Sequence, residues 1–212
     1  VFLSRHAAGH EVGVAHDVRF AELRRLRIAA RGLHVDEFVP SMSFPLSGGG
    51  GVGPFNLLES VAKLRAARRL WARLMKEKFG ARNPKTMQLK FSTGNCGSRM
   101  AAREPLNNIV RQTLFTLAAV LGGTRSINMA CYDEAFEIPS DESIRTALRI
   151  QQVVAHESGA ADTVDPLAGS YAVEALTDQV EEEAAAIVAD YESRGGIVPF
   201  IESGEIQRLL AR

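Results

Sequence analysis

Hydrophobic residues follow a helical spacing in some parts of this chain and form short extended runs in others. Apolar residues at helical spacing, bounded by capping residues and glycines, predict four long helices. The predicted helices cover residues 56–79, 104–121, 140–158 and 173–193, with shorter helices at 19–31 and near Ser203. Extended runs at residues 38–44, 86–92 and 125–130 predict strands, and residues 1–4 are a candidate fourth.

The order of these elements favours an α/β fold. Strands that alternate with helices indicate a parallel sheet with the helices packed outside it. Two architectures fit: an open, doubly wound sheet, or a partial (β/α)8 barrel of the TIM type. A whole barrel takes about 250 residues and eight strands. With 212 residues, about four βα units and C-terminal helices, this chain would need further strands to complete a barrel.

Composition narrows the class of protein. Apolar residues make up 46% and charged residues 24% of the chain, as in soluble globular proteins. No run approaches about 18 apolar residues, so we expect no membrane span. The first residues lack the pattern of a secretory signal, and two cysteines, Cys96 and Cys131, suit a reducing compartment. We therefore expect a cytoplasmic protein.

The formal net charge of zero conceals a strong asymmetry. Residues 1–112 carry 19 Lys and Arg against 8 Asp and Glu, whereas residues 113–212 carry 6 against 17. Two interpretations are open: opposed, solvated helix faces, or a basic surface that attracts an anionic ligand. Nucleic acid is disfavoured, because few aromatic residues are interleaved with the basic ones.

Candidate chemistry lies in two loops that follow predicted strands, at residues 92–99 and 131–139. In a (β/α)8 barrel such loops lie at the carboxyl face of the strands, where ligands bind. The glycines of residues 48–53 fit neither a Walker loop nor a dinucleotide fingerprint, so a surface loop is favoured over a phosphate cradle. The histidines and cysteines lack zinc-binding spacing, so we expect no metal site.

A stronger signal comes from several strings taken together. They occupy residues 32–38, 62–72, 105–111, 118–124, 132–135, 157–159 and 165–171. These strings, in this order, resemble the substrate-binding barrel of the methylmalonyl-CoA mutase family, the cobalamin-dependent acyl-CoA mutases. The resemblance covers nearly the whole chain. It implies that residues 1–212 correspond to the C-terminal half of that (β/α)8 barrel, from about the fifth strand onward.

The resemblance also implies a reaction and its partners. The family rearranges the carbon skeleton of a short-chain acyl-CoA by radical chemistry that adenosylcobalamin supplies. The complementary half of the barrel and the cobalamin-binding domain would come from a partner chain or a longer precursor. We therefore expect an oligomer, with like or unlike subunits, that binds acyl-CoA and adenosylcobalamin.

Site residues follow from the same resemblance. Glu134 matches the family's acidic contact to the adenosyl ribose, and Ala130 stands where the family has an asparagine that contacts the adenosyl group. Candidates for substrate binding are Gly94, Asn95, Gly97, Arg125 and Asn128, of which Gly97 matches the glycine beside the substrate. Lys63, Asn107, Asn108 and Arg111 match family positions of structural role.

The two candidate catalytic positions depart from the family pattern. Ser4 and Ser92 stand where the family has histidines, and Gly94 and Arg125 each replace a glutamine. General acid catalysis by an imidazole contributes about 10²–10⁴-fold, so these changes argue against ordinary methylmalonyl-CoA turnover. Arg125 would instead pair with a different anionic group of the substrate.

Three functional hypotheses remain after this comparison. The first is a divergent acyl-CoA mutase with altered specificity. The second is a catalytically inactive partner or structural subunit of a heteromeric mutase, which keeps the fold and has lost pocket residues. The third is an unrelated ligand-binding α/β domain.

Overall fold

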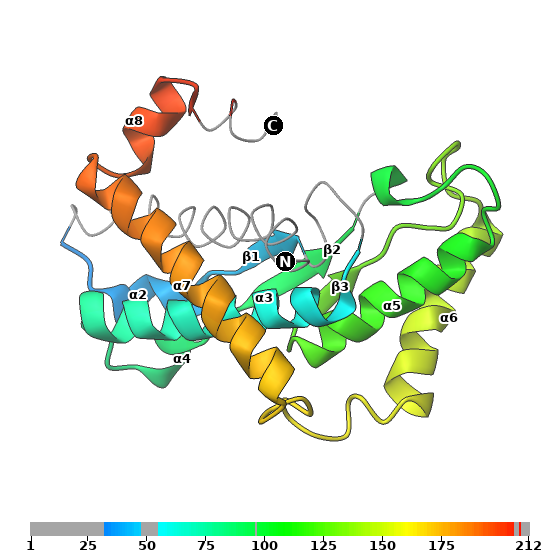
Figure 1. The fold of residues 1–212 in the computed structure, drawn as a ribbon, viewed down its shortest axis with the longest axis horizontal. Coiled ribbons are helices and arrows are strands. Elements are labelled where there is room, and N and C mark those ends of the chain that lie inside the picture. Colours follow the sequence, from blue (N-terminus) through cyan, green and yellow to red (C-terminus); the bar gives the residue numbers. More distant parts are fainter. Residues whose placement is uncertain (1–31, 48–54, 96, 206–207, 209–212) are drawn as a thin grey trace.

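The computed structural model describes residues 32–47, 55–95, 97–205 and 208 (Figure 1). Its helices are α2 (Val35–Phe38), α3 (Leu57–Arg73), α4 (Pro84–Met87), α5 (Asn107–Leu121), α6 (Asp141–Glu157), α7 (Tyr171–Ser193) and α8 (Ile197–Glu202). Its strands are β1 (Phe44–Ser47), β2 (Phe91–Gly94) and β3 (Ser126–Asn128). Shorter helical turns are η1 (Val39–Ser41), η2 (Leu74–Lys78) and η3 (Gly97–Arg99).

The three strands form one parallel sheet in the order β1-β2-β3. Helix α3 lies in the connection between β1 and β2, and α5 lies in the connection between β2 and β3. The predicted parallel α/β arrangement is therefore confirmed for this part of the chain.

The two faces of the sheet differ in chemistry. Phe44, Leu46 and Phe91 are buried, and Leu46 and Phe91 pack against α3. Residues paired in register point to the same face of a sheet. The pairs Ser92 with Ser126 and Gly94 with Asn128 therefore lie on the face opposite Phe44, Leu46 and Phe91. Ser126 and Asn128 are exposed, and Ser92 and Gly94 are half-buried. One face thus belongs to an apolar core and the other is polar and open.

Helix α7 forms a further layer on the outside of α3. Figure 1 shows α7 crossing α3, and the two helices bury Ala66, Ala67, Val180 and Ala184 in one cluster with the sheet. The small alanines let the helix backbones approach closely. Asn56 caps α3 by accepting the Glu59 backbone N–H at 3.2 Å. The order of layers is therefore sheet, α3, α7.

The four long helices appear where the apolar spacing predicts them. Helix α3 with the turn η2 occupies the predicted 56–79, and α6 and α7 match the predictions at 140–158 and 173–193. Helix α5 begins three residues later than predicted, at Asn107, after Glu104 with its left-handed φ of 56°.

Two predicted extended runs were partly wrong. Residues 35–41 form α2 and η1, so only the end of the run 38–44 enters a strand. His34 accepts the Asp36 N–H at 3.3 Å, and the Glu37 carboxylate accepts the His34 N–H at 2.8 Å. These reciprocal bonds start a helix that residue propensities alone do not indicate.

The strand predicted at residues 86–92 begins later than expected, because a tertiary contact holds its first residues in a helix. Residues 84–87 form α4, and β2 begins only at Phe91. The Asp36 carboxylate accepts the Thr86 hydroxyl at 2.6 Å and the backbone N–H of Asn83 at 3.2 Å, which ties α4 to α2. The Thr86 hydrogen bond is also the main reason that the pKa of Asp36 lies below its ordinary value.

The remaining predictions concern the chain ends and the glycine run. Helix α8 lies at Ile197–Glu202, just before the point near Ser203 where a terminal helix was expected. The predicted elements at 1–4 and 19–31 and the glycines at 48–53 lie outside the described residues. No helix within the described ranges is long and apolar enough to span a bilayer.

Candidate functional site

The carboxyl ends of β2 and β3 lie side by side and open into two loops. Gly94 ends β2 and Asn128 ends β3, paired in register. The loop after β2 carries Asn95 and Gly97, and the loop after β3 carries Ala130 and Glu134. The structure thus brings six of the nine sequence-derived site residues to one end of the sheet, with Ser92 in the strand beside them.

Gly97 and Glu134 are in direct contact through the backbone. A Cβ atom added to Gly97 would lie 2.6 Å from the Glu134 carbonyl oxygen, closer than real Cβ atoms approach any heavy atom. The glycine is therefore required by space at this point. Its contact fixes the loop after β2 against the loop after β3.

The Glu134 carboxylate is partly engaged by its own loop. Its Oε1 accepts the Cys131 backbone N–H at 2.7 Å, which orients the side chain. Apart from the neighbouring Cys131, no described residue bonds to this carboxylate, and the side chain is half-buried. The carboxylate can accept a hydrogen bond from a hydroxyl group of a ligand.

Cys131, three residues before Glu134, is a free and buried cysteine. Burial raises the pKa of its thiol, and the nearby Glu134 and Asp133 carboxylates raise it further. A thiol with a raised pKa is a poor nucleophile at neutral pH. We assign this cysteine to packing against Met129, Ala147 and Ile150.

Asn95 uses its side-chain amide within the protein. Its Nδ2 donates to Gln112 Oε1 at 2.9 Å, and its Oδ1 accepts the Ala130 backbone N–H at 2.9 Å. Ala130 is only 2% exposed, so its methyl group faces the protein interior. In this structure Asn95 and Ala130 join the two loops, whereas Ser92, Gly94 and Asn128 lie on the open face of the sheet.

Two predicted site residues do not join this cluster. Arg125 precedes β3, and its backbone N–H donates to the Phe91 carbonyl at 3.1 Å. Arg125 and Asn128 are three positions apart along extended backbone, which corresponds to about 10 Å at the usual rise of about 3.3 Å per residue. Its exposed side chain therefore belongs to the amino end of the sheet. Ser4 lies outside the described residues.

Sequence reasoning left Gln112 unassigned and treated Asn108 as structural. Both lie on the buried face of α5, one turn apart, with 1% and 0% of their surface exposed. Their side chains reach the two loops of the candidate site. Buried amides at helical spacing are a signal that could have identified them.

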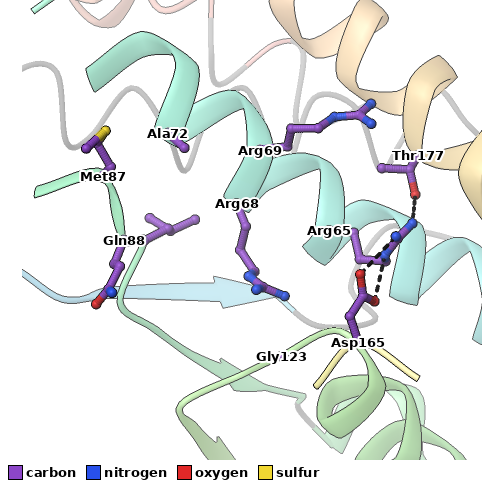
Figure 2. Close-up of a pocket in the computed structure, with 10 residues that line it drawn as sticks. Arg65, Arg68, Arg69, Ala72, Met87, Gln88, Gly123, Asp165 and Thr177 are labelled. Carbon is purple, nitrogen blue, oxygen red and sulfur yellow. Dashed lines mark hydrogen bonds and ion pairs between the residues drawn. The ribbon is translucent and has the colours of Figure 1, made fainter. Parts of the chain in front are cut away.

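The amino end of the sheet holds a cavity of ≈ 530 Å³ with a different chemistry (Figure 2). Arginines of α3 line it together with residues 87–89, which precede β2, and Gly123, which precedes β3. Figure 2 shows Arg65 bonded to Asp165 and Thr177. All five guanidinium N–H groups of Arg65 have acceptors, on Asp165, Glu174 and Thr177, at 2.8–3.2 Å.

These contacts account for part of the charge asymmetry. The basic side chains of α3 and η2 pair with acidic side chains of α7: Arg65 with Glu174, Arg69 with Asp178 and Glu181, Arg73 with Glu181, and Lys78 with Glu192. The hydrogen bonds from Arg65 lower the pKa of Glu174 to about 2. The expectation of opposed, solvated helix faces is wrong here, because the basic and acidic helices face each other.

Among the residues that the structure covers, no three His, Cys, Asp or Glu side chains come together as a metal site would require. The candidate site at the carboxyl end consists instead of a carboxylate, backbone groups, amides and small side chains. This set suits an uncharged, hydroxyl-bearing ligand.

Comparison with known proteins identifies the class to which this arrangement belongs. Residues 21–212 match the family model for methylmalonyl-CoA mutase. The chain is 44% identical over 184 residues to the 2-hydroxyisobutanoyl-CoA mutase large subunit of Aquincola tertiaricarbonis, covering 87% of this chain and 32% of that protein. It is 41% identical over 179 residues to the methylmalonyl-CoA mutase of Escherichia coli, covering 84% of this chain and 24% of that protein.

A similar match extends to Homo sapiens, whose mitochondrial methylmalonyl-CoA mutase is 37% identical over 173 residues, covering 82% of this chain and 22% of that protein. The chain belongs to the methylmalonyl-CoA mutase family, and the resemblance found in the sequence is confirmed. It spans between 22% and 32% of the length of these three relatives.

Proposed function

We propose that this chain forms part of the substrate-binding barrel of an adenosylcobalamin-dependent acyl-CoA mutase. The observation that carries the proposal is the backbone contact between Gly97 and Glu134 at the carboxyl end of a parallel sheet. It joins the residue matched to the adenosyl ribose with the residue matched to the substrate loop. The family membership of the chain supports the same assignment.

The chemical difference between the two faces of the sheet favours a barrel over a doubly wound sheet. A doubly wound parallel sheet is covered by helices on both faces and is apolar on both. Here the face with Ser92, Gly94, Ser126 and Asn128 is small and polar, as the ligand-bearing lining of a barrel would be. In this proposal residues 1–212 are the C-terminal half, and further strands close the barrel from a longer precursor or a partner chain.

The residues of the β3 loop fit adenosylcobalamin. The Glu134 carboxylate can accept a ribose hydroxyl, and the Cys131 N–H holds the carboxylate in place. Because Gly97 has no side chain, the loop after β2 can approach the backbone of Glu134 closely. When bound, the cofactor supplies the radical chemistry that a carbon-skeleton rearrangement needs. The role of this chain is then to bind, orient and shield.

The open face would hold the acyl-CoA. Ser92 and Asn128 offer a hydroxyl and an amide for hydrogen bonds, and Gly94, paired with Asn128, adds no side chain to this face. A serine at position 92 supplies no cationic proton donor, so the proposed substrate is a short-chain acyl-CoA other than methylmalonyl-CoA. Arg125 precedes β3 and is an odd number of positions from Ser126 and Asn128, so its side chain belongs to the other face of the strand and this arrangement gives it no contact with the substrate.

The serine at position 92 also favours a second candidate function. A subunit that has lost its catalytic imidazoles would keep the fold and serve as a partner in a heteromeric mutase. One relative is named as a large subunit, so assembly from unlike chains has a precedent in the family.

One experiment separates these two functions. The complete mutase that contains this chain is given adenosylcobalamin and a panel of short-chain acyl-CoAs, and isomerisation and hydrogen exchange into substrate are measured. For the catalytic role, we expect Glu134→Gln to reduce turnover about 10–100-fold, as loss of a charge-assisted hydrogen bond would. The matched control is Glu137→Gln, which alters an exposed carboxylate three residues away. Equal turnover in both variants would leave only the partner role.

A further inference from the structure

The buried face of α5 carries two amide side chains where apolar residues would pack more simply. Asn108 and Gln112 lie one helical turn apart, and neither is more than 1% exposed. Phe115, Ala118 and Ala119 continue the same buried surface with apolar groups. Burying an amide is unfavourable unless its donors and acceptors are bonded. The partners of these two amides are therefore informative.

Asn108 bonds to both loops of the candidate site. Its Nδ2 donates to the Ala101 carbonyl at 2.9 Å and to the Tyr132 carbonyl at 2.7 Å. Its Oδ1 accepts the Ala101 N–H at 3.0 Å and Arg111 Nη1 at 2.7 Å. Every donor and acceptor of this amide is used, and Tyr132 lies two residues before Glu134.

Gln112 makes a second connection through Asn95. Gln112 Oε1 accepts Asn95 Nδ2, and Asn95 Oδ1 accepts the Ala130 N–H, each at 2.9 Å. Gln112 Nε2 donates to Met100 Sδ at 3.0 Å. The loop after β2 is thus held at Asn95 and Met100, and the loop after β3 is held at Ala130.

We infer that Asn108 and Gln112 are positioning residues that set the Glu134 carboxylate relative to the substrate face of the sheet. The inference rests on the proposed function. Their bonds fix residues 130 and 132, on either side of Cys131, whose N–H holds Glu134 Oε1. Amides are suited to this role because one side chain can both donate and accept directional hydrogen bonds, and so can hold two loops at once.

The test substitutes Gln112→Met, which keeps most of the side-chain volume and removes both hydrogen bonds. We make the change in the complete mutase and measure the dissociation constant for adenosylcobalamin, the KM for acyl-CoA, and amide hydrogen exchange in residues 129–136 before cofactor is added. The expected result is a dissociation constant raised about 10-fold, faster exchange in that segment, and a KM changed less than about 3-fold. Asn107→Ala, on the exposed side of the same helix, is the matched control.

A second pair of variants tests whether the effect passes through Glu134. In a Glu134→Gln background, Gln112→Met should raise the dissociation constant by less than about 2-fold, because the group that it positions is already altered. An equal rise in both backgrounds would overturn the inference, and so would an unchanged dissociation constant in Gln112→Met with normal loop exchange. If Gln112→Met folds poorly, Asn95→Ala breaks the same bridge from the loop side and is judged by the same criteria.

Different results would overturn the proposed function and the positioning role of Gln112. A wild-type mutase that neither binds adenosylcobalamin nor turns over any acyl-CoA would overturn the proposed function and this inference with it. A wild-type enzyme that binds and turns over, with a Gln112→Met variant that is equally competent, would overturn the inference alone.

Discussion

The two ends of the parallel sheet are held together by different forces. At the amino end, α3 and α7 are joined by ion pairs, and Arg65 alone bonds to Asp165 and Glu174 with two edges of its planar guanidinium group. At the carboxyl end, the loops are joined by neutral amides and a glycine contact. The first kind of contact depends on charge, whereas the second depends on shape and direction.

This difference suits the roles proposed for the two ends. An ion pair at the periphery tolerates small movements, because Coulomb attraction falls off slowly with distance. A loop that presents one carboxylate to a ligand needs a fixed geometry, and nearby charges would compete with that carboxylate for hydrogen bonds. We therefore expect the amino end to respond to salt and pH and the carboxyl end to respond less.

The largest effect is expected from Asn108→Leu at the carboxyl end. The variant leaves the Ala101 and Tyr132 carbonyls without their buried donor and the Arg111 guanidinium without one acceptor, and we expect the free energy of unfolding to fall by about 3 kcal/mol. Urea unfolding at low and high salt should give the same loss. The exposed neighbour provides the control, since Asn107→Leu should change stability by no more than about 0.5 kcal/mol. A loss that depended on salt would contradict the proposed difference between the ends.

An intermediate effect is expected from Arg65→Met at the amino end. The Arg65 side chain is 10% exposed, but its partners Asp165 and Glu174 are 27% and 36% exposed, so solvent screens part of the attraction. We expect a loss of about 1–2 kcal/mol in dilute buffer. Raising the salt concentration to about 1 M shortens the screening length to about 3 Å and should reduce this loss. The same loss at both salt concentrations would show that Arg65 acts by packing.

The sequence predicts the helices of both ends better than the contacts between them. Apolar spacing located α3, α5, α6 and α7, because helical periodicity depends on residues near one another in the chain, and the alternation of strands with helices indicated a parallel sheet. The bridge from Gln112 to Ala130 through Asn95 joins three separate segments, so no local pattern predicts it. The contact of Gly97 with Glu134 has the same origin, although the family resemblance had singled out both residues.

Contacts between residues far apart in the chain also explain the elements that the sequence misplaced. The strand predicted at residues 86–92 starts late because Asp36, fifty residues before Thr86, holds that hydroxyl in α4. The charge asymmetry was visible in the sequence, but the pairing of Arg69 with Asp178 and Glu181 depends on α7 crossing α3. Long-range contacts thus decide where local signals are overruled.

The smallest effect is expected from acidification of the amino end. Hydrogen bonds from Arg65 lower the pKa of Glu174 from 4.5 to about 2 in the folded protein. Because the folded pKa lies below the unfolded one, the contribution of Glu174 to stability is fully present above about pH 4.5 and is lost as the pH falls toward 2. The stability advantage of the wild type over Glu174→Gln, measured by urea midpoints from pH 7 to pH 3, should therefore shrink below pH 4.5. Glu182→Gln, an exposed carboxylate on the same helix, is the control, and an advantage that stayed constant across this range would mean that Glu174 contributes by shape, as the amides of the carboxyl end do.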